Sequence, residues 1–131
     1  MDKTVTEEIR AHIQKAERRL KVAKALHKDG EYEDAVSRAY YSIYHAAQAA
    51  LLTEGMRADS HRGLATLFGL HLVEPGKLDK KLAKYLKNVR DDREAGDYEI
   101  YSSIDQETSE TALKEADVFV RAIRVFLATR T

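Results

Sequence analysis

Apolar residues recur at steps of three and four along most of this chain, the spacing that places them on one face of an α-helix. No segment shows the alternation that a strand would give. Short polar or glycine-containing turns separate the periodic segments. The pattern therefore predicts an all-α protein, an antiparallel up-and-down helical bundle with four long helices plus one short helix, in a single domain over residues 1–131. The expected long helices span 6–28, 31–54, 77–94 and a last one capped by Ser103 or Asp105 that ends near 128, and the short one runs from about 60 to 72.

The second expected helix is unusual because no Asp, Glu, Lys or Arg lies between Arg38 and Glu54, in a chain that is 34% charged. A helical wheel gives it two strips. The core strip holds Val36, Ala39, Ile43, Ala46, Ala47 and Ala50, and the second strip holds Arg38, Ser42, His45, Ala49 and Leu52. The second strip predicts a subunit interface in a homodimer, and the alternative is a central helix of a monomeric bundle.

Composition limits the classes of function. Acidic and basic residues number 22 each, so the formal net charge is zero, and any site for a polyanion has to be a local cluster of Arg and His. The chain has no Cys, and its five His show no paired ligand spacing, so we expect no metal and no cofactor. Its start is not a signal peptide, and no apolar run approaches the roughly 20 residues that span a bilayer, so we expect a cytoplasmic protein and no membrane partner.

Arg38 and His45 are the first pair of residues that could carry chemistry. Seven residues apart on one helix, they differ by about 20° around the axis and roughly 10 Å along it. A permanently cationic Arg suits a phosphate, and His transfers protons near neutral pH. Together they are the minimum for cleaving RNA, an acid or base plus a stabiliser of phosphorane charge. The alternative is that His45 is a hydrogen-bonded residue of the core.

Arg90, Arg93, Asp97 and Tyr98 form a second constellation. The two Arg share a face at a helix end, and Tyr98, in a segment from 95 to 104 that follows no helical period, could stack on a base. The cluster could bind a nucleotide or a phosphate group. In the alternative, Arg93 pairs with Asp97 or Asp92 and only fixes the loop.

One family shares these segments. The run Ala39-Tyr40-Tyr41-Ser42-Ile43-Tyr44-His45-Ala46-Ala47, followed by Ser60-His61, Phe68, Gly76-Lys77-Leu78 and Arg93-Glu94-Ala95-Gly96-Asp97-Tyr98, resembles the HEPN family over about residues 10 to 127. It is most similar to short single-domain prokaryotic HEPN proteins. The resemblance implies a helical bundle that forms a symmetric homodimer with a cleft between subunits. Many members are ribonucleases, often toxins, with an Arg-x(4–6)-His motif, and others work with a small nucleotidyltransferase encoded beside them.

Two segments of the chain bear on which of these family functions to expect. Arg38 to His45 fits the Arg-x6-His spacing, whereas the segment where many active members keep their motif reads Arg93 to Tyr98, with no His. The first hypothesis is a protein of a toxin–antitoxin-like or defence module, acting as a metal-independent ribonuclease through Arg38 and His45 or as a nucleotidyltransferase partner. The second is a non-catalytic homodimeric module that binds a nucleotide or nucleic acid through Arg90, Arg93 and Tyr98. The third is a purely structural dimeric partner.

Overall fold

The computed structural model describes residues 1–101 and 103–130, and within them the protein is an all-helical bundle with no strand, as the sequence predicts. Four long helices and one short helix are present, and a π-helical turn, η1, follows the short helix. The elements are α1 (Lys3–Lys28), α2 (Tyr32–Leu52), α3 (His61–Phe68), η1 (Gly69–Val73), α4 (Lys80–Tyr98) and α5 (Gln106–Ala128).

Side-chain caps set the starts of four helices and correct two predicted boundaries. Asp2 accepts a hydrogen bond from the Thr4 amide, so α1 begins at Lys3 rather than Thr6. Asp105, and not the alternative Ser103, caps α5 by accepting from the Thr108 amide. Ser60 and Asp79 cap α3 and α4 in the same way.

The fourth helix differs most from its prediction. It begins at Lys80 instead of 77 and continues to Tyr98 instead of ending at 94. One ion pair at a spacing of four residues, Arg93 with Asp97, joins the extra turn to the predicted helix, and a second, Arg90 with Glu94, lies just before it. Such pairs favour the helical state, and neither produces the apolar period by which a helix is found in a sequence.

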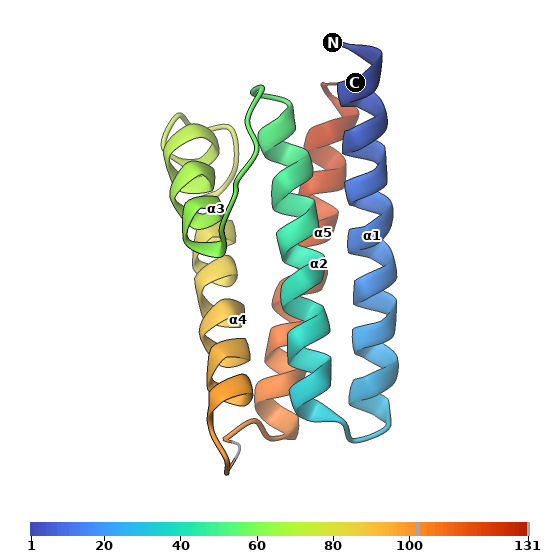
Figure 1. Cartoon of the computed structure of the whole chain (residues 1–131), viewed down its shortest axis with the longest axis vertical. Helices are drawn as coiled ribbons and strands as arrows, with labels where there is room; N and C mark the ends of the chain where they lie inside the picture. The colour runs from blue at the N-terminus through green and yellow to red at the C-terminus, as the bar shows by residue number, and fades with distance from the viewer. Residues whose placement is uncertain (102, 131) are drawn as a thin grey trace.

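Helix α2 is the centre of the bundle. It packs against α1, α3, α4 and α5, and its contact with α1 is the most extensive of all. Figure 1 shows α2 in front of α5, with α1 along one side and α4, capped by α3, along the other. In the described part of the chain α1 and α4 do not touch each other, so they flank α2 on opposite sides.

This packing corrects the interpretation of the second strip of α2. Ser42, Ala49 and Leu52 are already buried within one chain, His45 is half-buried and only Arg38 is exposed. Small residues on both helices allow α1 and α2 to approach closely, and those of α1, Ala16 and Ala23, are fully buried. The strip is thus occupied within the chain, and the homodimer stays a prediction. None of the helices described here is long and apolar enough to cross a membrane.

Candidate nucleic-acid interface

A continuous row of six aromatic rings crosses the bundle from α4 towards α1. Helix α2 contributes four of them, spaced so that they share one side of the helix, and α3 and α1 contribute one each. Every ring has a neighbour with centroids 5.1 to 5.5 Å apart, or 6.0 to 6.2 Å for the looser contacts. The members of this aromatic row are Tyr40, Tyr41, Tyr44, His45, His61 and His12. All except the fully buried Tyr40 are partly exposed, so the row reaches the surface.

Arg93 of α4 closes one end of the aromatic row. Its guanidinium carbon lies 5.1 Å from the ring centroid of Tyr41 and 5.3 Å from that of Tyr40, the distance of a cation–π contact. Its Nε lies 3.3 Å from a carboxylate oxygen of Asp97 but makes no hydrogen bond of good geometry. The side chain is 19% exposed, so a flat cation is held at the edge of the aromatic surface.

A short hydrogen bond fixes the middle of the row. The Tyr40 hydroxyl lies 2.7 Å from His61 Nδ1. Burial raises the pKa of Tyr40 to about 12, so the phenol keeps its proton at neutral pH. The tautomer of His61 determines which of the two groups donates this hydrogen bond. Burial, and next the charges of Arg93 and Arg90, lower the pKa of His61, so the ring is neutral at pH 7.

The other end of the row is a pair of histidines from two helices. His12 Nδ1 and His45 Nδ1 are 3.0 Å apart. Burial lowers the pKa of His45 to about 4, and His12, Lys15 and Arg19 add to the effect. Burial also lowers the pKa of His12, against the opposing charge of Glu8. Both rings are therefore neutral at pH 7, and one donates the shared hydrogen bond while the other accepts it.

Of the first predicted pair, Arg38 and His45, only His45 lies in the aromatic row. Arg38 is exposed, and in the described part of the chain it has no ion pair or hydrogen bond. The cations whose charges reach His45 are Lys15 and Arg19 of α1. The geometry therefore offers phosphate-binding charge from α1, on a basic face whose position beside α2 follows from helix packing and not from any sequence pattern.

The members of the second predicted constellation do not all lie near the aromatic row. Arg93 joins the aromatic row, and the charges of Arg90 and Arg93 both reach Tyr40 and His61. Arg90 pairs with Glu94 at 3.2 Å, and Arg93 with Asp97, as the structural alternative predicted. Tyr98 is 84% exposed and makes no ring contact in the described residues. The tyrosines that meet Arg93 are those of α2 instead.

Two members of the row lacked a usable sequence signal. His12 lies on the same face of α1 as Glu8 and Lys15, and nothing in the sequence tells which helix that face meets. His61 stood out as the first residue of a helix, where an anion could bind, but its partner Tyr40 is 21 residues away. Both contacts depend on how helices pack, which one sequence does not reveal.

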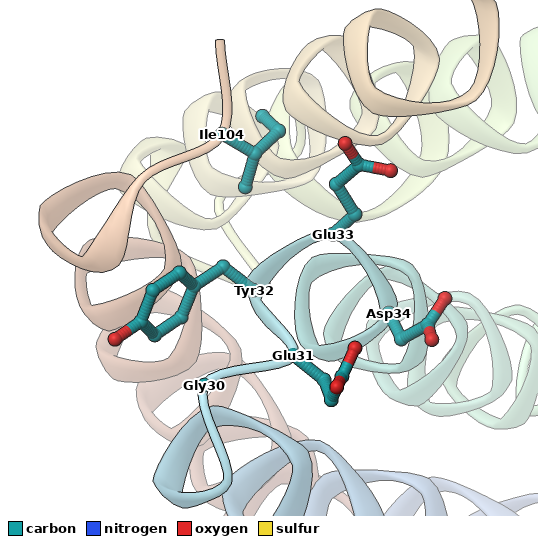
Figure 2. Close-up of a pocket in the computed structure, with 6 residues that line it drawn as sticks. All are labelled: Gly30, Glu31, Tyr32, Glu33, Asp34 and Ile104. Carbon is teal, nitrogen blue, oxygen red and sulfur yellow. The ribbon is translucent and has the colours of Figure 1, made fainter. Parts of the chain in front are cut away.

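A hollow of about 250 Å³ lies near the end of the bundle, where α1 turns into α2. Gly30, Glu31, Tyr32, Glu33, Asp34 and Ile104 line it. Figure 2 shows its three carboxylates pointing in different directions instead of converging on one point. No group of three or more metal-ligating side chains occurs in the residues described, in agreement with that divergence. This hollow therefore presents no converging set of ligands in the described residues.

Comparison with known proteins identifies relatives along nearly the whole chain. A family model described as the HEPN domain matches residues 9–126. The UPF0332 protein PH1297 of Pyrococcus horikoshii is 37% identical over 122 residues, covering 93% of this chain and 85% of the relative. A Methanocaldococcus jannaschii protein named putative toxin MJ0605 is 36% identical over 124 residues, covering 95% and 92%. The crystal structure of TT1696 from Thermus thermophilus shares the fold, with a TM-score of 0.76, 18% identity, and coverage of 90% of this chain and 97% of that one.

Proposed function

This chain belongs to the HEPN domain family, and we propose that it is a toxin-like protein of a prokaryotic toxin–antitoxin or defence module that binds single-stranded RNA on the aromatic row and cuts it without a metal ion. The relative named putative toxin supports the biological setting. The observation that carries the molecular part is the aromatic row itself, a surface of touching rings with Arg93 at one end and two histidines at the other.

Binding follows from rings and cations presented together. Proteins that hold single-stranded nucleic acid combine stacking platforms with a cationic track for the backbone, and each stacked base contributes about 1–3 kcal/mol. Here Tyr41 and Tyr44 are the partly exposed tyrosine rings of the row, and Lys15, Arg19 and Arg93 are cations beside it. Because the formal net charge of the chain is zero, this local concentration is what would attract a polyanion.

Cleavage of RNA needs a group that takes the proton of the 2′-hydroxyl, one that protonates the leaving oxygen, and a cation for the charge that develops on phosphorus. His45 has a neutral ring, so it is available as a base, and it lies among cations. In this proposal Arg38, two turns away on the same helix and exposed, contacts an adjacent phosphate.

The non-catalytic alternative rests on one specific observation. Arg38 makes no hydrogen bond or ion pair in the described part of the chain, and Arg93 contacts Tyr40 and Tyr41 whether or not His45 reacts. A module that only binds a nucleotide or an RNA end would use this Arg93 region alone. Binding without cleavage is the result that distinguishes it.

Two partners belong to the proposal. The family relationship supports a homodimer with α2 near the two-fold axis, and a small nucleotidyltransferase as the second protein of the module. Light scattering on the purified chain tests the first, with a mass of twice 14.9 kDa expected. Co-expression of this chain with the neighbouring gene product, followed by co-purification, tests the second.

The decisive experiment incubates the purified protein with end-labelled single-stranded RNA in the presence of EDTA. We expect binding, and products that end in a 2′,3′-cyclic phosphate. His45→Ala should still bind RNA, with at most a small loss of affinity, but lose cleavage by about a hundredfold or more, the usual contribution of one acid–base group. His71→Ala is the matched control, since His71 lies on η1 outside the aromatic row, and it should cut normally.

Two results would contradict parts of this proposal. Cleavage at the same rate by His45→Ala would remove the catalytic role of His45. Failure of the wild type to bind RNA, with the same low affinity as the triple variant Tyr41→Ala/Tyr44→Ala/Arg93→Ala, would remove the aromatic row as a nucleic-acid interface. Binding without cleavage would support the non-catalytic alternative.

A further inference from the structure

His12 of α1 and His45 of α2 meet through the same atom of each ring. Their Nδ1 atoms are 3.0 Å apart, and the ring centroids are 5.3 Å apart at a tilt of 33°. A hydrogen bond at this distance needs a proton on one Nδ1 and a lone pair on the other. The two neutral rings must therefore be different tautomers.

The tautomers give the two outer nitrogens opposite roles. The ring that donates at Nδ1 has a bare Nε2, which can accept a proton. The ring that accepts at Nδ1 carries its proton on Nε2, which can donate. No hydrogen bond to either Nε2 occurs within the described part of the chain, and both rings are partly exposed. One base and one acid are thus presented side by side, with no net charge on either ring.

We propose that His12 and His45 act as one proton-transfer pair in RNA cleavage, with the shared Nδ1 proton passing between the rings during the reaction. This inference rests on the proposed function, and it adds His12 as a group that works directly on the substrate. It also removes the need for a histidine that is charged in the resting protein.

During cleavage, protons pass through both rings. The bare Nε2 takes the proton of the 2′-hydroxyl as the 2′-oxygen bonds to phosphorus. The same ring gives its Nδ1 proton to Nδ1 of its partner, and the partner gives its Nε2 proton to the 5′-oxygen as the bond from phosphorus to that oxygen breaks. The products are a 2′,3′-cyclic phosphate and a 5′-hydroxyl. Each ring ends as the other tautomer, and the start is restored when water exchanges protons at the two Nε2 atoms and the shared proton returns between the Nδ1 atoms.

The surroundings of the pair fit this role. On α1, Lys15 and Arg19 add positive charge that disfavours an imidazolium and suits a phosphate. The nearby carboxylate, Glu8, is bound at both oxygens by Arg57, with distances of 2.6 and 2.8 Å. It therefore makes a salt bridge instead of accepting a proton from His12. On α2, Tyr44 packs edge-on against His45 and completes the set of titratable neighbours.

The test measures single-turnover cleavage of labelled single-stranded RNA by the full chain in EDTA, together with RNA affinity and thermal stability. His12→Asn is the informative variant, because its amide can still hydrogen-bond His45 Nδ1 but cannot pass a proton on. We expect His12→Asn and His12→Ala each to slow cleavage at least a hundredfold, as His45→Ala does, with a loss of RNA affinity much smaller than the loss of rate. His71→Asn, a histidine change outside the aromatic row, should leave cleavage intact.

A pH profile separates the pair from a single catalytic histidine. Because neither ring has to be charged, the rate should be level from about pH 7 to pH 8 and fall only as acid protonates the pair. A pair that needs one imidazolium would lose activity as the pH rises through that range, and this profile would overturn the proposal. A double variant, His12→Asn with His45→Ala, should be no slower than either single variant.

The outcomes separate the proton-transfer pair from the proposed ribonuclease function. An active wild type with an equally active His12→Asn overturns the proton-transfer pair and leaves cleavage through His45 standing. A wild type that binds RNA and never cuts it overturns the catalytic part of the proposed function, and the pair with it. Loss of cleavage in both His12 variants with preserved binding and folding supports the pair.

Discussion

Tyr40 and His61 are joined by a 2.7 Å hydrogen bond that ties the middle of α2 to the first turn of α3. The Tyr40 ring also lies under the guanidinium of Arg93, so α4 meets the same residue. One fully buried phenol therefore holds three helices in register where the aromatic row reaches the surface. Changes at Tyr40 should accordingly affect folding and the row together.

We expect Tyr40→Phe to lower the free energy of unfolding by about 1 kcal/mol, because it removes the hydrogen bond and keeps the ring. Urea unfolding measures the change. Tyr85→Phe is the matched control on α4, since Tyr85 is half-buried and has no hydrogen bond in the described part of the chain, and it should cost less than about 0.5 kcal/mol. An equal loss in both variants would show that the bond to His61 contributes nothing.

The neutral histidines predict how stability depends on pH. Burial lowers the pKa of His12, His45 and His61 in the folded protein, that of His45 to about 4, from the usual value of 6.5. The unfolded chain therefore binds more protons between these values. The stability that these rings contribute is fully present above pH 6.5 and is lost as the pH falls through the folded-state pKa values.

Thermal unfolding between pH 7 and pH 5 measures this loss, and comparison with a His45 variant separates it from the titration of Asp92 and Glu115, whose pKa values are raised by burial. For His45 alone we expect a decrease on the order of 1–2 kcal/mol after allowance for solvent screening. His45→Gln should show a flatter dependence than the wild type, whatever its stability at pH 7. A dependence as steep as that of the wild type would indicate that the folded-state pKa of His45 is ordinary.

The bundle could be predicted from the sequence because its core residues repeat with the period of a helix. Its central helix was also identifiable, since α2 is free of acidic and basic residues between Arg38 and Glu54. The last turn of α4 was missed because it is held by an ion pair, Arg93 with Asp97, which leaves no apolar period. Local patterns thus predicted the helices but missed the end of α4, which is stabilised by charged side chains.

The site was harder to predict for a different reason. His45 and Arg93 were identified from their chemistry, but their neighbours lie on other helices. His12 is 33 residues from His45 in the sequence, and the Tyr40 ring of α2 contacts Arg93 of α4. The sequence instead suggested partners nearby in the chain, Arg38 on the same helix for His45, and Tyr98 in the segment after the fourth helix for Arg93. The packing of α1 and α4 against α2 supplied closer partners.

Two glycines of the third helical segment should respond in opposite directions to the same change. Gly69 has φ of −62°, and a Cβ there would meet nothing within 4 Å. We expect Gly69→Ala to raise the free energy of unfolding by about 0.4–1 kcal/mol by restricting the unfolded chain. A Cβ on Gly63 would lie 2.9 Å from Ser60 Oγ, the atom that caps α3 through the Gly63 amide.

Gly63→Ala should therefore lower the free energy of unfolding by about 0.5–2 kcal/mol, the range for a lost cap. Urea unfolding of the two variants under identical conditions gives the comparison. Stabilisation by both would mean that Ser60 can move aside without losing its cap, and destabilisation by both would mean that the turn into η1 needs a glycine at 69.

Arg93 provides the most direct test of the aromatic row as an RNA interface. Arg93→Ala removes the cation that lies over Tyr41 and Tyr40, and we expect RNA affinity to fall roughly tenfold, with a salt dependence shallower by about one ion. Arg93→Lys keeps the charge but loses the flat guanidinium, so it should restore the salt dependence and only part of the affinity. Fluorescence anisotropy at several salt concentrations measures both quantities.

Lys87→Ala is the matched control for Arg93→Ala. It removes one positive charge from the same helix, but Lys87 is 76% exposed and pairs with Asp91 instead of an aromatic ring. Its RNA affinity should stay within about twofold of the wild type, because an exposed charge away from the row contributes little. If both variants weaken binding equally, only net charge matters, and RNA does not use the contact between Arg93 and the tyrosines of α2.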